Sequence, residues 1–188
     1  MKNINRWALM RNTSYESLAT HSLEVAAVAH ALAELGNSRL GRSYDADRAA
    51  VMGIYHDMPE ILTGDMPTPV KYFNPEIRRA FGEIEKTAGR ALLDTLPKDL
   101  QPVYSKLLTP DEQDELCKLV KAADKISALI KCAEEQRSGN EDFSAAYSST
   151  KDAIKKMNCP EADIFLSEFF DSYSIVLDTC LAPGDDKK

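Results

Sequence analysis

The chain has 188 residues, of which 44% are hydrophobic, and its formal net charge is −7. This length and composition predict one domain whose core needs no disulfide or metal to hold it together. The acidic balance argues against a nucleic-acid polymer or an anionic membrane as partner, because each requires a basic face.

The distribution of apolar residues and cysteines indicates the compartment. No apolar run approaches the roughly 18 residues of a membrane span. The first residues lack the long apolar stretch of a signal peptide. The four cysteines include no C-x-x-C pair, so reduced thiols are expected rather than a zinc ribbon. We therefore predict a cytoplasmic protein without membrane partners.

The first half of the chain shows mainly helical patterns. Apolar residues from His21 to Leu35 follow a rough helical stripe. Asp45 is placed to cap a second helix, Asp47 to Tyr55, which should stop near Pro59. The stretch from Thr63 to Pro69 contains one glycine and two prolines, which predicts a loop.

The second half continues in the same way. Asn74, followed by proline, is typical of a helix start. Thr109-Pro110-Asp111-Glu112 is the clearest start signal, because it combines a capping threonine, a proline at the first helical position and a capping-box glutamate. The helix it opens should end at Ser138-Gly139-Asn140. Two further helices are predicted, around Asp142 to Met157 and Glu161 to Leu181.

These patterns together predict an all-α fold. Strand alternation is missing, as are the G-x-G-x-x-G and G-x-x-x-x-G-K-[ST] motifs of Rossmann and P-loop proteins. We expect a single helical domain over residues 1–182 and a disordered tail at 183–188.

Four side chains from different predicted helices have the chemistry of a metal site. An imidazole beside a carboxylate, as in His56-Asp57, suits a divalent cation, although a helix end with a satisfied imidazole has the same sequence. His21 is one of only three histidines and begins a helix. Asp124 borders the apolar stripe of its helix, where an unpaired carboxylate is costly. Together these residues offer two nitrogen and two oxygen ligands.

The sequence resembles the HD-domain phosphohydrolases and, within them, the bacterial 5′-deoxynucleotidases. This resemblance implies an HD-type helical bundle with the metal site between helices. It covers most of the chain and is carried by five segments: Ile4 to Asn12, His21 to Ala26, Tyr55 to Asp57, Glu60 to Asn74 and Lys121 to Asp124.

The resemblance also implies the metal site. His21, His56, Asp57 and Asp124 would bind one divalent ion, and cobalt, manganese, nickel, iron and zinc all suit such a set. His30 lies half a helical rotation from His21 and cannot reach the same ion. Since two-metal members of the family have extra histidine ligands, we expect a single metal.

Further roles follow from the same resemblance. Arg6 would orient the phosphate, Trp7 would pack against the sugar, and Glu60 would handle the catalytic proton. The remaining substrate contacts would come from the loop residues Asp65, Met66, Pro67 and Thr68 and from the metal ligands His21, Asp57 and Asp124.

The implied reaction is hydrolysis of 2′-deoxyribonucleoside 5′-monophosphates to deoxynucleoside and phosphate, usually by a homodimer. Two alternatives stay open: another HD activity on nucleoside triphosphates or cyclic phosphodiesters, and an inactive metal-containing scaffold that binds nucleotides. Two positions depart from the family. The family usually has glutamate before the first metal histidine, where this chain has Thr20, and a small residue where this chain has Pro59, although the spacing from Asp57 to Glu60 is kept.

Overall fold

The structure is a computed structural model and describes residues 1–175. The proposed tail at 183–188 and the last part of the helix predicted to reach Leu181 lie outside these residues. The described part of the chain is helical, with one isolated antiparallel bridge between Asn5 and Ser17. The predicted all-α class is therefore confirmed.

Side-chain caps fix the starts of the principal helices in the first half. The Ser17 side chain accepts a hydrogen bond from a backbone N–H of α1 (Leu18–Arg39). Asp45 caps α2 (Ala46–Tyr55) and Asn74 caps α5 (Pro75–Asp94), as the sequence predicts. Each cap satisfies one of the backbone donors that a helix start leaves unpaired.

Two short helices lie between α2 and α5. They are α3 (Glu60–Thr63) and α4 (Thr68–Lys71), and the loop between them spans residues 64–67. The predicted loop is thus two residues too long at its end, because proline is accommodated in the first turn of α4.

The predicted helix start at Thr109 is wrong. This threonine ends α6 (Gln101–Leu108), a helix that the sequence did not indicate, and its N–H and hydroxyl both donate to the Ser105 carbonyl. The next helix, α7 (Glu115–Arg137), starts later, where the Asp114 side chain accepts from the backbone N–H of Leu116. Because the Thr109 hydroxyl is bonded to the last turn of α6, it does not cap α7.

Of the two helices predicted at the C-terminal end, the first agrees with the structure to within two residues. A short 3₁₀ turn, η1 (Glu141–Phe143), leads into α8 (Ser144–Lys156). The last predicted helix is shorter than expected, because α9 (Pro160–Glu168) gives way to a 3₁₀ segment, η2 (Phe170–Ser174). None of the described helices is long and apolar enough to cross a membrane.

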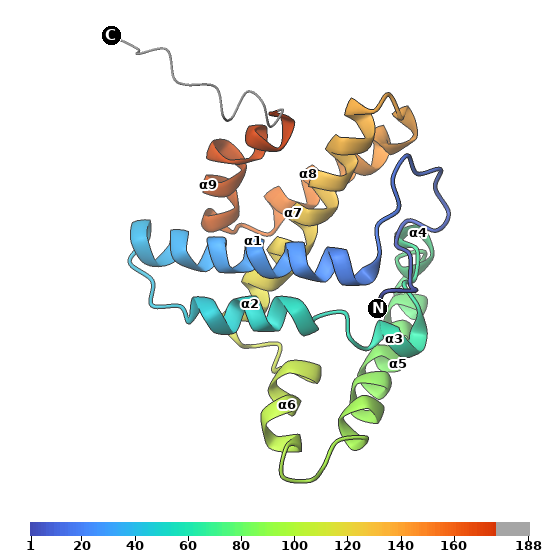
Figure 1. Cartoon of the computed structure of the whole chain (residues 1–188), viewed down its shortest axis with the longest axis vertical. Coiled ribbons are helices and arrows are strands. Elements are labelled where there is room, and N and C mark those ends of the chain that lie inside the picture. The colour runs from blue at the N-terminus through green and yellow to red at the C-terminus, as the bar shows by residue number, and fades with distance from the viewer. Residues whose placement is uncertain (176–188) are drawn as a thin grey trace.

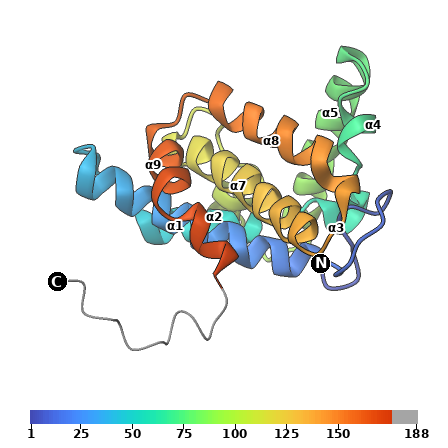
Figure 2. The ribbon, with the colours of Figure 1, turned by 90° about the horizontal axis from the view of Figure 1, so that it is seen from above.

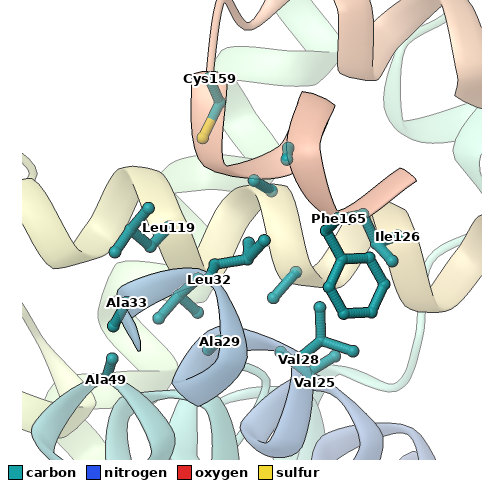
Figure 3. Close-up of a cluster of buried hydrophobic side chains, with 14 of the residues drawn as sticks. Val25, Val28, Ala29, Leu32, Ala33, Ala49, Leu119, Ile126, Cys159 and Phe165 are labelled. Atoms are coloured by element: carbon teal, nitrogen blue, oxygen red, sulfur yellow. The ribbon is translucent and has the colours of Figure 1, made fainter. Parts of the chain in front are cut away.

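The core forms where α1 packs against α2 on one side and α7 on the other, with α9 above them (Figures 1 and 2). Figure 3 shows Val25, Leu32, Ile126 and Phe165 converging from three of these helices. Gly53 allows the close approach of α2 to α1, because a Cβ atom there would lie 2.7 Å from the Ala26 Cα. This contact brings the end of α2 next to the beginning of α1.

Candidate active site

Four side chains meet where α1, α2 and α7 come together. His21 lies early in α1, His56 and Asp57 directly follow α2, and Asp124 lies within α7. His21 Nε2 is 3.3 Å from Asp124 Oδ1 and 3.5 Å from Asp57 Oδ2, and His56 Nε2 is 2.9 Å from Asp57 Oδ2. Potential ligand atoms of His21, His56 and Asp124 all lie within 4.8 Å of one another.

The unpaired imidazole nitrogens fit a cation. The Nε2 atoms of His21 and His56 are buried and have no hydrogen-bond partner among the described residues. His56 Nδ1 lies 2.8 Å from the Gly53 carbonyl, which can only accept, so Nδ1 carries a proton and Nε2 is the nitrogen that faces the carboxylates and can bind a cation. Two imidazoles and two carboxylates thus match the ligand types of a divalent transition-metal ion, which can take further ligands beyond these four.

The electrostatics of the cluster favour positive charge at its centre. Burial opposes protonation of His56, but the adjacent carboxylates of Asp57 and Asp124 outweigh it and raise the His56 pKa to about 9. Burial likewise opposes ionisation of Asp124, yet the adjacent imidazoles of His21 and His56 hold its pKa well below the usual range. The carboxylates therefore stay ionised and stabilise a cation, whether a proton or a metal.

Behind His21, hydrogen bonds run through the Ser127 hydroxyl to the carboxylate of Glu24. Ser127 Oγ lies 3.0 Å from His21 Nδ1 and donates to Glu24 Oε2 at 2.5 Å. Arg6 Nη1 lies 2.7 Å from the same nitrogen and can only donate. With a proton, Nδ1 donates to Ser127; without one, it accepts from Arg6. A neutral imidazole that binds a metal through Nε2 carries its proton on Nδ1, so metal binding corresponds to the hydrogen bond with Ser127.

The N-terminal segment brings Arg6 and Trp7 to the cluster. Arg6 Nη1 donates to Glu16 Oε2 at 3.1 Å, and Arg6 Nη2 lies 3.8 Å from Asp124. Trp7 packs against Phe143, with 5.2 Å between ring centroids. Its φ of 60° is unfavourable for a bulky residue and costs on the order of 1 kcal/mol, so surrounding contacts must hold it.

A buried carboxylate anchors the next part of this segment. Glu135 of α7 is fully buried and accepts hydrogen bonds from the backbone and hydroxyl of Thr13 and from Asn140. It also pairs with Lys131, whose ammonium donates to the Ser14 carbonyl. These bonds fix the N-terminal segment to α7, the helix that carries Asp124.

Glu60 lies in the cleft beside the cluster. It is the first residue of α3, is 5% exposed, and its Oε2 has no hydrogen-bond partner among the described residues. Burial, with the charges of Asp57 and Asp65, raises the Glu60 pKa to about 9. The cleft has a volume of about 290 Å³ and is lined by these residues among others: His56, Asp57, Glu60, Lys71, Lys121 and Asp124.

A larger and more open hollow lies elsewhere, along α5. It measures about 560 Å³ and is lined by Tyr72, Phe73, Arg78, Lys86 and their neighbours. Its lining includes neither a histidine nor any of the predicted site residues. The smaller cleft is therefore the one associated with the reactive side chains.

Asp65, in the loop before α4, interacts electrostatically with the residues of the site. Burial and the Asp57 charge raise the pKa of Asp65, while Arg6 opposes this, so Asp65 lies within interaction range of both. Met66 and Pro67 are half-buried and Thr68 is exposed. Contacts of these three residues with a nucleotide remain predictions.

Three side chains of the site were not singled out from the sequence: Glu16, Glu24 and Ser127. Only Ser127 gave a signal, as a polar residue on the apolar stripe of α7. His30 is kept away from the site, as expected, and its Nε2 lies 3.8 Å from Asp47.

Comparison with known proteins decides the family. The family described as 5′-deoxynucleotidase YfbR-like matches residues 1–173. The chain belongs to this family. It is 43% identical to 5′-deoxynucleotidase VV1113 of Vibrio vulnificus, over 95% of this chain and 92% of that protein. It is also 43% identical to 5′-deoxynucleotidase YfbR of Escherichia coli O127:H6, over 95% of this chain and 90% of that protein.

Solved structures show the same fold for this YfbR-like chain. An HD-domain phosphohydrolase of Listeria innocua superimposes with a TM-score of 0.80 at 24% identity, over 92% of this chain and 83% of the other. The HD phosphohydrolase DatZ of cyanophage S-2L, solved with dA and one catalytic Zn²⁺ ion, gives a TM-score of 0.63 at 19% identity, over 91% and 90% of the two chains. The predicted HD-type bundle is thereby confirmed.

Proposed function

We propose that this chain is a metal-dependent 5′-deoxynucleotidase, which hydrolyses 2′-deoxyribonucleoside 5′-monophosphates to deoxynucleoside and phosphate. One observation carries the proposal: His21, His56, Asp57 and Asp124 converge beside the buried, unpaired carboxyl group of Glu60. Membership of the YfbR-like family supports the choice of a deoxynucleotide over other phosphate esters.

The four converging residues would hold one divalent ion. When bound, such an ion supplies charge that neutralises the phosphoryl oxygens and acidifies the attacking water. Cobalt, manganese, nickel, iron and zinc are all compatible with two imidazoles and two carboxylates. Zinc is the first ion to test, because the similarly folded DatZ was solved with Zn²⁺.

Arg6 would bind the phosphoryl group. Its Nε is buried without a hydrogen-bond partner among the described residues, and an unpaired buried guanidinium donor is costly until an anion arrives. The planar guanidinium matches two oxygens of a phosphate. Arg6 would therefore orient the phosphorus for attack by water from the side opposite the 5′ oxygen.

Glu60 would move the proton that the reaction requires. Water adds its oxygen to phosphorus and gives up a proton, the bond between phosphorus and the 5′ oxygen breaks, and that oxygen takes a proton. Burial beside Asp57 and Asp65 raises the pKa of Glu60, so this carboxyl group holds a proton more readily than an exposed one, and the charge of a bound cation would favour release of that proton. A single residue then serves the water and the leaving oxygen.

Selectivity for deoxyribose would come from Trp7 and the 65–68 loop. The indole would leave no room for a hydroxyl at C2′, and a pocket that crowds out an added hydroxyl discriminates by about a hundredfold. Asp65 would hydrogen-bond the sugar or the base, with Met66, Pro67 and Thr68 closing that side of the nucleotide. We also propose that the protein acts in the cytoplasm as a homodimer.

A phosphate-release assay tests this function. The purified protein is stripped of metal, reloaded with each of several divalent ions, and given deoxy- and ribonucleoside 5′-monophosphates, nucleoside triphosphates and a cyclic phosphodiester. We expect orthophosphate from the deoxynucleoside monophosphates, and only with metal. Turnover confined to triphosphates or cyclic diesters would assign another HD activity, and nucleotide binding without any turnover would assign a scaffold.

A further inference from the structure

Glu16 receives the two side chains proposed to bind the substrate. Its Oε2 atom accepts from Trp7 Nε1 at 2.8 Å and from Arg6 Nη1 at 3.1 Å. The Glu16 side chain is 10% exposed and that of Arg6 is 12% exposed, so water competes weakly for these charge-assisted bonds. One buried oxygen therefore links the guanidinium to the indole.

The backbone around Trp7 explains why such a link is needed. Consecutive side chains of an extended segment point to opposite sides, which would separate Arg6 from Trp7. The left-handed conformation of Trp7 departs from that alternation, and the Arg6 Cζ atom lies 5.9 Å from the indole centroid. Met10 N–H and the Asn12 side chain both donate to the Trp7 carbonyl. Within residues 1–175, only Glu16 hydrogen-bonds the side chains of both Arg6 and Trp7.

Glu16 is also connected rigidly to the metal-binding helix. Its backbone carbonyl accepts from Arg6 N–H at 3.0 Å, and Ile4 accepts from Leu18 N–H at 2.9 Å. The next residue, Ser17, caps α1, whose first turns carry His21. The position of the Glu16 carboxylate is thus set by the same helix end that sets the first metal ligand.

We propose that Glu16 is a positioning residue that holds Arg6 and Trp7 together at a fixed place relative to His21. Arg6 then binds the phosphate while Trp7 packs against the C2′ side of the same sugar. This inference rests on the proposed function. A carboxylate with a purely structural role would support folding without affecting the choice between deoxyribose and ribose. Glu135 is such a structural carboxylate, because its hydrogen bonds go to Thr13, Lys131 and Asn140.

The test compares three variants with the wild type, all loaded with the ion that supports activity. Glu16→Gln keeps the shape but removes the charge, and Glu16→Asp keeps the charge but shortens its reach. Glu34→Gln removes an exposed charge from α1 as a matched control. Trp7 is the only tryptophan, so its fluorescence reports this site directly, independently of turnover. Metal content and unfolding temperature are measured on each protein.

For Glu16→Gln we expect KM for a deoxynucleoside monophosphate to rise roughly tenfold, the effect of losing one charge-assisted hydrogen bond, with a smaller change in kcat. The preference for deoxyribose should narrow and the Trp7 emission should shift, while metal content stays at the wild-type level. Glu16→Asp should recover part of each effect. Should Glu16→Gln unfold at the assay temperature, Glu16→Asp decides on the same readouts, with an altered sugar preference and emission as the expected result.

The inference is overturned if the Gln and Asp variants match wild type and Glu34→Gln in KM, sugar preference and Trp7 emission. It is also overturned if activity falls only in proportion to lost metal or lost folded protein. A wild-type protein that releases no phosphate from any deoxynucleoside monophosphate contradicts the proposed function itself, whereas an active wild type with unaffected variants contradicts only the role of Glu16.

Discussion

Asp124 Oδ1 lies 3.3 Å from His21 Nε2, although the two residues come from α7 and α1. The packing of these helices through a common apolar core makes this proximity possible. Because this core, and not the four ligands, holds the helices together, a substitution that removes one ligand should reduce metal binding more than it reduces the stability of the fold.

Asp124→Asn is therefore expected to lose the metal. The amide is a weaker ligand than the carboxylate and does not offset the charge of the ion. Hydrolysis should fall by roughly a thousandfold, equivalent to several kcal/mol of charge stabilisation. Elemental analysis of the purified protein and phosphate release measure the two effects. His30→Ala, at a half-exposed histidine away from the site, should match wild type in both. Full metal occupancy in Asp124→Asn would refute the assignment of this ligand.

Ser127→Ala should weaken metal binding without removing any ligand. The substitution breaks the connection from His21 through Ser127 to Glu24, so the imidazole loses the partner that orients it. Loss of such a supporting bond typically costs about 10- to 100-fold in metal affinity. Competition with a chelator measures this affinity. Ser148→Ala, at an exposed helical serine bonded only to backbone, is the control. Equal affinities in both variants would show that the hydrogen bonds through Ser127 do not matter.

Glu60→Gln should separate catalysis from binding. The amide fills the same space but neither accepts the water proton nor donates one to the 5′ oxygen. We expect kcat to fall at least about 100-fold, with KM and metal content close to wild type. Steady-state kinetics with elemental analysis distinguish this from a general disruption. Unchanged kcat would remove Glu60 from the chemical step.

Glu135 should make the stability of the protein depend on pH in acid. Burial alone would raise its pKa, but hydrogen bonds from Lys131, Asn140 and Thr13 lower the pKa to about 2, against an ordinary value near 4.5. A lowered folded-state pKa stabilises the fold above pH 4.5, and this contribution is lost as the pH falls from 4.5 towards 2.

Glu135→Gln tests this directly. Removing the carboxylate leaves the buried Lys131 ammonium without its counter-charge, which should cost on the order of 3 kcal/mol at neutral pH. Denaturant unfolding at pH 7 and pH 3 should show a smaller pH dependence in this variant than in wild type. Glu134→Gln, at the exposed neighbouring position, should behave like wild type. If the free energy of unfolding fell equally between pH 7 and pH 3 in wild type and both variants, Glu135 would not be the source of the pH dependence.

The sequence predicts those parts of the fold that depend on local chemistry. Asp45 and Asn74 cap helices because a short polar side chain directly precedes an apolar stripe, and both caps are confirmed. Thr109 carries an even stronger local signal, yet it closes α6, since its hydroxyl is bonded backwards to Ser105. Two neighbouring helices compete for this residue, and local pattern does not decide between them.

The site divides in a similar way. The four proposed ligands and Glu60 lie in motifs that carry a family resemblance. The structure brings the four ligands together, and all but His21 line one cleft with Glu60. Glu16 and Ser127 lie outside these motifs, and Glu24, although it lies in the segment from His21 to Ala26, has no role that the motif indicates. Their environments arise only when the N-terminal segment and α7 close around α1, so the relevant neighbours are distant in sequence.

Anomalous diffraction from crystals loaded with zinc or another active ion tests the central claim most directly. The account predicts a single ion within bonding distance, about 2.0–2.2 Å, of His21 Nε2, His56 Nε2 and carboxylate oxygens of Asp57 and Asp124. An ion bound elsewhere, or one that leaves Asp124 and His56 uncoordinated, would contradict it.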